Sequence, residues 1–81
     1  MSEQVYNRLA VVRAERKVSR QALAEAVGVH YQTIGYIERG QYNPSLDLAL
    51  KVARFFELPV EALFSLEPIQ PLTDEVYGRK Q

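Results

Sequence analysis

The stretch SRQALAEAVGVHYQTIGYIERG, residues 19–40, contains two short helical patterns separated by a glycine turn. Ser19 is a residue type that accepts a backbone hydrogen bond at a helix start, and Leu23 falls at an inward position of the helix that follows. Gly28 comes directly after this pattern, where a left-handed glycine commonly ends a helix. The second pattern starts at His30, a weaker cap. Two helices joined by so tight a turn make a helix-turn-helix.

The second helix of this unit, which we place within residues 20–39, has two contrasting faces. At about 100° per residue, Ile34 and Ile37 fall on one side and are expected to pack inward. Gly35 lies on the outward side, where a missing side chain would let the backbone approach a surface closely. The outward side chains suit base edges and phosphates rather than a purely solvated surface: Tyr31, Gln32, Tyr36 and Arg39.

The rest of the pattern predicts an all-α domain of five helices with no confident strand. Val5 and Leu9 recur at helical spacing, so the first helix is expected to include both. Ser45 follows a turn-forming Asn43-Pro44 pair and is the expected cap of the fourth helix. The three helices outside the central pair are predicted at residues 3–16, 46–57 and 60–64.

Composition places limits on the function. The chain has 81 residues, of which 47% are apolar, and it contains no cysteine, so no thiolate metal site is expected. Its zero net charge hides an asymmetry, because residues 8–54 carry +4 and residues 55–81 carry −3. A basic body is compatible with an anionic partner. We expect no cofactor, no metal, no membrane segment or leader peptide, and a cytoplasmic location.

The segment from Ser19 to Phe64 resembles the lambda-repressor-like, Cro-type family of helix-turn-helix proteins, also called the xenobiotic-response-element family. The resemblance rests on Ile37-Glu38-Arg39-Gly40, followed by Asn43-Pro44-Ser45-Leu46, and on Val60-Glu61-Ala62-Leu63-Phe64. It implies a small stand-alone regulator of transcription, a repressor, that binds a palindromic operator as a homodimer and is nucleoid-associated. The DNA-binding domain would cover residues 1–66, and residues 67–81 would form a C-terminal tail.

The resemblance also implies roles for individual residues. Arg13 and Glu38 match a partly buried ion pair that ties the first helix to the third. Arg39 lies at a helix end and is therefore assigned to phosphate rather than to a base. The base-facing residues would be Tyr31, Gln32 and Tyr36, and the phosphate contacts would be Arg20, Thr33, Arg39, Gln41, Tyr42 and Asn43.

Three departures from the family pattern are visible. His30 stands where serine or threonine is usual, and Ala22 stands where glutamate often completes a capping box. Gly35 and Tyr36 replace a small polar residue and a basic one. The outward face of the recognition helix is therefore less basic and more aromatic than is typical, and more of the affinity for DNA must come from residues elsewhere.

The helix expected at residues 46–57 is apolar on most of its sides, so something further must cover it. The last helix and the tail can supply that cover, either within one chain or from a second subunit. The residues assigned to a homodimer contact are Leu63, Phe64, Leu66, Ile69 and Leu72.

Two other classes of function compete with a regulator. An enzyme is disfavoured, because His30 is the one histidine of the chain and no nucleophile motif, phosphate loop or metal cluster accompanies it. An antitoxin or adaptor, whose main partner is another protein, remains the alternative, because the charge is near neutral and the tail is apolar.

Overall fold

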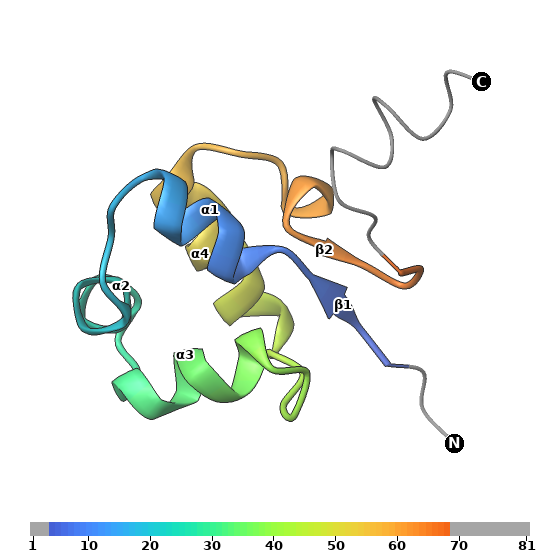
Figure 1. Cartoon of the computed structure of the whole chain (residues 1–81), viewed down its shortest axis with the longest axis horizontal. Helices are drawn as coiled ribbons and strands as arrows, with labels where there is room; N and C mark the ends of the chain where they lie inside the picture. Colours follow the sequence, from blue (N-terminus) through green and yellow to red (C-terminus); the bar gives the residue numbers. More distant parts are fainter. Residues whose placement is uncertain (1–3, 69–81) are drawn as a thin grey trace.

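The computed structural model describes residues 4–68 (Figure 1). Four α-helices form the body, and two very short strands pair beside them. In chain order the elements are β1 (Tyr6–Asn7), α1 (Leu9–Glu15), α2 (Arg20–Val27), α3 (Tyr31–Glu38), α4 (Leu46–Phe56), the 3₁₀-helix η1 (Val60–Ala62) and β2 (Phe64–Ser65). In the view of Figure 1, α2 lies at the left, α3 runs along the bottom, and the two strands lie at the right.

The helix starts follow the capping residues that the sequence predicts. Ser19 Oγ accepts a hydrogen bond from the backbone N–H of Ala22 at 3.0 Å. His30 caps α3 through Nδ1, which accepts from the N–H of Gln32 at 3.1 Å. Each bond pairs a backbone donor that the first turn of a helix leaves without an intrahelical partner. The predicted caps at the starts of α2 and α3 are thus confirmed.

Ser45 caps α4 in the same way and also forms a hydrogen bond with the side chain of Asp47. Its Oγ accepts from the N–H of Leu48 at 3.3 Å, and its hydroxyl donates to Asp47 Oδ1 at 2.6 Å. The second bond favours the ionised carboxylate and lowers the pKa of Asp47. An ionised aspartate in the first turn also suits the positive end of the helix dipole.

The turn between α2 and α3 depends on Gly28, whose φ of +79° lies in the left-handed region. Its N–H and that of Val29 both donate to the carbonyl of Ala24, at 2.8 and 3.0 Å, and so close the end of α2. Because a side chain at this φ costs roughly 1–2 kcal/mol, glycine is the residue that suits the position. The chain therefore reverses within three residues and α3 packs across α2.

The prediction of a first helix over residues 3–16 is wrong at its start, because Val5 is not helical and α1 begins at Leu9. Tyr6 instead pairs with Ser65, and the N–H of Arg8 donates to the carbonyl of Leu63 at 3.0 Å. These pairing partners lie near the other end of the described chain. Local hydrophobic periodicity cannot register such a distant partner.

The prediction of five helices and no strand is corrected at the other end as well. The segment expected as a fifth helix makes only the 3₁₀ turn η1, and Phe64 then enters β2 opposite Asn7. Pairing with β1 draws the chain into an extended conformation before a full helical turn can continue. The rest of the prediction stands, since the fold is mostly helical and built around a helix-turn-helix.

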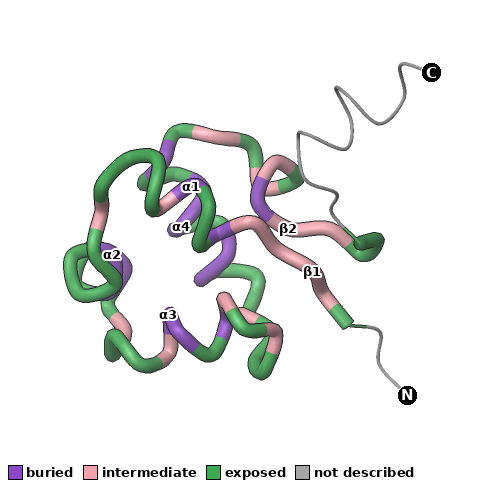
Figure 2. Tube along the Cα trace, in the orientation of Figure 1, coloured by how far each residue is buried: buried purple, intermediate pink, exposed green. Residues whose placement is uncertain are grey.

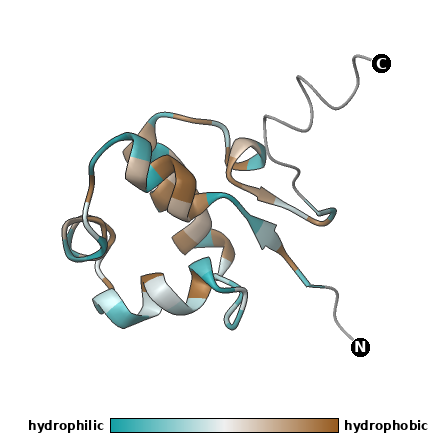
Figure 3. Ribbon diagram, viewed as in Figure 1, coloured by the Kyte–Doolittle hydropathy of each residue, from teal (hydrophilic) through white to brown (hydrophobic). Residues whose placement is uncertain are grey.

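The core is formed where the four helices and η1 meet (Figure 2). It contains no buried polar or charged residue among those described. In Figure 3 the hydrophobic colours concentrate on α1 and α4 at the centre of the molecule, whereas α3 is pale or teal over much of its length. The side chains that are less than 2% exposed are Leu9, Leu23, Ile34, Ile37, Val52, Phe56 and Leu63.

The residues expected at a dimer contact fall into different environments. Leu63 is 0% exposed and packs in the core of its own chain, so its assignment to the dimer contact is wrong. Phe64 is half-buried against the same core, whereas Leu66 is 60% exposed. Ile69 and Leu72 lie outside the described residues.

This difference in burial predicts opposite results for two identical substitutions. Leu63→Ala should lower the free energy of unfolding by about 2–5 kcal/mol, because it removes a fully buried side chain and leaves a cavity. Leu66→Ala is the matched control and should change it by less than about 0.5 kcal/mol in dilute protein. Urea denaturation followed by circular dichroism measures both. Equal losses for the two variants would contradict the burial described here.

Candidate nucleic-acid interface

Helix α3 is fixed by one face and open on the other. Ile34 and Ile37 are 0% and 1% exposed and hold the inner face against the core. Tyr31 and Tyr36 are 43% and 46% exposed on the outer face, and Gln32 is also exposed there. The predicted separation of the two faces is therefore confirmed, and the three residues expected to face bases all lie at the surface.

The cap of α3 also organises the first of these tyrosines. The rings of His30 and Tyr31 are stacked, with centroids 4.6 Å apart and planes 29° from parallel. Because His30 Nδ1 is held by the backbone N–H of Gln32, the imidazole has a fixed direction. The stacked ring restricts Tyr31 in turn. A restricted aromatic side chain loses less conformational freedom when it meets a partner surface.

Gly35 is buried although it lies on the outer face, and the side chain that covers it is Arg39. A Cβ placed on Gly35 would lie 3.2 Å from Nη1 and 3.6 Å from Nη2 of that arginine. Arg39 also stands over the ring of Tyr36, with Cζ 5.4 Å from the centroid. The expectation that Gly35 exposes bare backbone is thus wrong, because the guanidinium fills the space.

Glu38, the last residue of α3, links this helix to α1 and α2. Its carboxylate is only 2% exposed and accepts from Arg13 Nε at 2.7 Å and from Arg13 Nη2 at 3.4 Å. Arg20 Nε donates to the same carboxylate at 3.0 Å. Arg13 also donates to the carbonyl of Val18, in the connection between α1 and α2. The predicted ion pair is present and forms part of a larger network.

The place of Arg20 in this network could not be read from the sequence. Its side chain is 44% exposed, and its partner Glu38 stands 18 positions away in the chain, beyond any local spacing rule. Arg20 is the first residue of α2, so it stands beside the positive end of that helix. The carboxylate of Glu38 offsets this unfavourable position and fixes the direction of the arginine.

The residues that flank α3 are also accessible. Tyr42 is 48% exposed, Gln41 and Asn43 are exposed, and Thr33 is half-buried. Arg39 Nε donates to Gln41 Oε1 at 3.3 Å, which connects the last turn of α3 to the loop that follows. The structure thus brings Arg39 and Gln41 together.

Sequence reasoning missed one residue that positions the interface. Asn7 Nδ2 donates to the carbonyl of Ile37 at 2.8 Å, and Asn7 Oδ1 accepts from the N–H of Leu9 at 3.0 Å. One amide therefore holds the end of α3 against the start of α1. Asparagine two residues before an apolar helical pattern was an available signal, but the periodicity of the first helix obscured it.

The described residues carry neither a metal cluster nor a membrane span. Within residues 4–68, no three histidine, aspartate or glutamate side chains lie close enough to hold a metal ion together. In that same span, no helix has the length and apolar character needed to cross a membrane.

The network around Glu38 predicts unequal roles for its two arginines. Arg13→Ala should lower the free energy of unfolding by about 3 kcal/mol, because it leaves a desolvated carboxylate with one half-exposed partner. Arg20→Ala should cost about 0–1 kcal/mol, as is usual for an exposed ion pair. Chemical denaturation of both variants at neutral pH makes the comparison. A larger loss for Arg20→Ala would show that Arg13 is not the main partner.

Comparison with known proteins agrees with this geometry. The family model described as helix-turn-helix, HTH_3, matches residues 9–63. An uncharacterized HTH-type transcriptional regulator of Methanocaldococcus jannaschii, MJ0272, is 44% identical over 61 residues, which cover 75% of this chain and 92% of that protein. Repressor protein C of Escherichia phage P2 is 33% identical over 52 residues, covering 64% of this chain and 52% of the repressor.

A solved structure shows the same arrangement of elements. The crystal structure of a putative DNA-binding protein from Bacteroides fragilis superposes with a TM-score of 0.70 at 33% identity, covering 75% of this chain and 98% of that one. The match to the family model spans the helix-turn-helix unit and the core that carries it. The chain therefore belongs to the HTH_3 family of helix-turn-helix transcriptional regulators, whose fold is of the lambda-repressor and Cro type.

Proposed function

We propose that this protein is a sequence-specific repressor that binds a palindromic operator as a homodimer, with α3 in the major groove. The observation that carries the proposal is the open outer face of α3, where Tyr31, Gln32 and Tyr36 are exposed while Ile34 and Ile37 are buried. A helix held by its inner face and bearing polar and aromatic groups on its outer face suits the groove. The related phage repressor supports the direction of regulation.

The three exposed side chains of α3 divide the reading of bases among them. Gln32 can donate to and accept from adenine at once, which makes it the strongest candidate for a base-specific contact. Tyr31 and Tyr36 each offer a hydroxyl and an apolar ring, which suits the methyl group of thymine. His30 lies beside Tyr31 at the start of the helix and limits the directions that this tyrosine can take.

The phosphate contacts would come from residues around α3. Arg20 donates Nε–H to Glu38, and within residues 4–68 its terminal nitrogens have no partner, so they remain for a phosphate oxygen. Thr33, Gln41, Tyr42 and Asn43 are accessible at least in part and add neutral donors. Contacts of this kind fix the register of a protein on DNA and carry little sequence information.

A homodimer would join two such domains through surfaces that one chain leaves uncovered. Leu66 is 60% exposed, and Leu46 and Leu50 of α4 are 73% and 49% exposed. Together with Ile69 and Leu72 of the segment beyond, these residues are the ones we assign to a second copy. A twofold dimer places its recognition helices about 34 Å apart, which is one turn of DNA.

The proposed division of the chain is a DNA-binding domain over residues 1–66 and a tail over residues 67–81. We assign the protein no catalytic activity and no cofactor. It would act on the chromosome, in the cytoplasm. An antitoxin or adaptor role would require a stoichiometric protein partner, and no contact described here favours that role over DNA binding.

The first experiment is selection of binding sites from a random pool of double-stranded DNA at about physiological salt, with folding checked by circular dichroism. We expect enrichment of a palindrome whose half-sites lie about 34 Å apart, because two copies of α3 read it symmetrically. Enrichment of single half-sites would remove the dimer from the proposal. A folded protein that enriches no sequence would overturn DNA reading altogether.

Gln32→Ala tests the reading of a base. On the selected operator it should weaken binding by about 1–3 kcal/mol and relax preference at one base pair, because a bidentate contact is lost. On unrelated DNA it should bind like the wild type, since phosphate contacts remain. Fluorescence anisotropy on both duplexes measures the two affinities, with Lys51→Ala of α4 as a control away from α3. Unchanged binding to the operator would rule out Gln32 as a reader.

A further inference from the structure

The end of α3 carries an arginine whose position is not that of an ordinary phosphate contact. Arg39 is the residue directly after α3, yet its guanidinium reaches back one turn to Gly35, near the middle of the helix. A helical side chain naturally leans toward the N-terminus and covers the turn before its own Cα. The positive charge therefore stands over the outer face, between Tyr31 and Tyr36 in angular position and close to Gln32.

Two interactions hold this guanidinium above Gly35. It lies against the space that a Cβ of Gly35 would occupy, 3.2–3.7 Å away. It stands over the ring of Tyr36 at 5.4 Å, within the range of a cation–π contact. Its Nε donates to Gln41 Oε1 at 3.3 Å. An arginine held by these two interactions is oriented before any partner arrives, so less of its freedom is lost on binding.

The donors that remain match one base. Within residues 4–68, Nη1 and Nη2 of Arg39 make no hydrogen bond, and they form the planar fork of the guanidinium. Guanine presents two acceptors, O6 and N7, side by side in the major groove, and a two-pronged arginine contact is the commonest way of recognising it. A phosphate contact would not need the charge to be carried to the centre of the helix.

Gly35 explains how the arginine can lie there. Glycine is the weakest helix former after proline, so alanine would favour α3. Its φ is not in the left-handed region, so backbone conformation does not require glycine here. A Cβ at this position would lie 3.2 Å from Nη1, so even a single added carbon would push the guanidinium of Arg39 outward from where it now lies.

We propose that Gly35 is free of a side chain so that Arg39, braced by Tyr36 and Gln41, reads a guanine in the operator. This inference rests on the proposed DNA-binding function and adds a specificity-determining pair to it. It replaces the assignment of Arg39 to phosphate and turns Tyr36 from a direct reader into a support for the reader.

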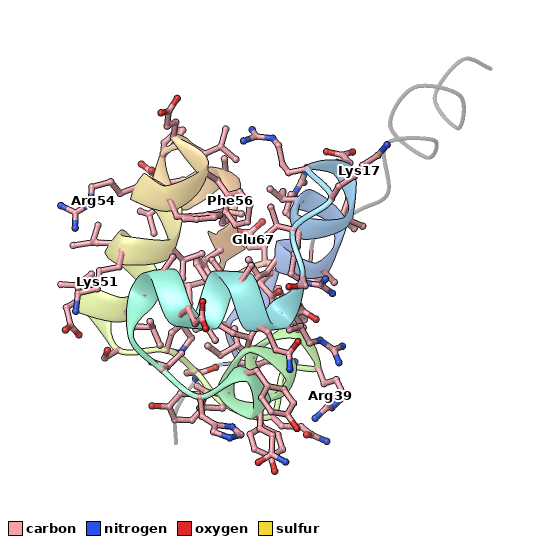
Figure 4. The ribbon with its side chains drawn as sticks, turned by 90° about the vertical axis from the view of Figure 1, so that its left-hand side faces the viewer. Lys17, Arg39, Lys51, Arg54, Phe56 and Glu67 are labelled. Atoms are coloured by element: carbon pink, nitrogen blue, oxygen red, sulfur yellow. The ribbon has the colours of Figure 1, made fainter. Side chains whose placement is uncertain are left out.

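The test begins with site selection by the wild type and by Arg39→Lys, which keeps the charge but loses the fork. The wild type should enrich a guanine at one position of each half-site, and Arg39→Lys should show no base preference at that position. The variant should keep the salt dependence of wild-type binding, because its charge is unchanged. In the wild-type operator, replacing that guanine by 7-deazaguanine removes N7. This replacement should weaken wild-type binding by roughly tenfold or more and leave Arg39→Lys unaffected. Arg54→Ala is the control for the loss of a positive charge, because Arg54 lies on the opposite side of the molecule from Arg39 in Figure 4. This variant should keep the preference for guanine.

Gly35→Ala completes the test. The variant should melt at the same temperature as the wild type or higher, because α3 gains a better helix former, yet discriminate less strongly for the same guanine. Loss of the preference together with a lower melting temperature would assign Gly35 to folding and overturn its part of the proposal. If Arg39→Lys selects the wild-type consensus in full, Arg39 is no base reader, although the repressor proposal stands. No enrichment by the wild type would overturn both.

Discussion

The rest of the structure depends on the ion pairs that the carboxylate of Glu38 makes with Arg13 and Arg20. This carboxylate is almost fully desolvated, and such a charge is tolerated only when oriented donors surround it. Arg13 supplies two of them from α1 and Arg20 supplies one from α2. The end of α3 is therefore located relative to both preceding helices by charge as well as by apolar packing. Apolar contacts alone would leave the rotation of so short a helix less well defined.

The opposite end of α3 is fixed by local backbone requirements. Gly28 sets the turn and His30 caps the first residues, so the direction of α3 relative to α2 is built into the chain itself. The side chains on the outer face between these two ends are not needed to hold α3 in place, apart from the contacts of Arg39 with its neighbours. A recognition surface can vary in sequence on such a frame without disturbing the core.

How much could be predicted from the sequence depends on how far each signal reaches. The caps at Ser19 and Ser45 and the break at Gly28 are local, and the structure confirms them. The pairing of Tyr6 with Ser65 joins distant segments, so helical periodicity misled the prediction for both ends of the domain. The ion pair of Arg13 and Glu38 was predicted through family resemblance and not through spacing.

Side-chain conformation set a further limit on the prediction of the site. The residue types on the outer face of α3 were correctly placed by helical geometry, because α3 is regular. That Arg39 folds over Gly35 depends on rotamers and on Gln41 beyond the helix, which no wheel includes. The exposure of Leu66 beside the burial of Leu63 likewise follows from strand pairing, which the sequence pattern did not reveal.

The pairing of β1 with β2 has a consequence for the order of events during synthesis. The helix-turn-helix unit is made of local contacts, so it can begin to form while the chain is still emerging from the ribosome. The core is closed by Leu63, and the start of α1 is held by residues 63–65. A nascent chain whose residues 63–65 are still inside the ribosome therefore lacks both the closed core and the support for the start of α1. A segment made late in synthesis therefore completes the packing around the first helix.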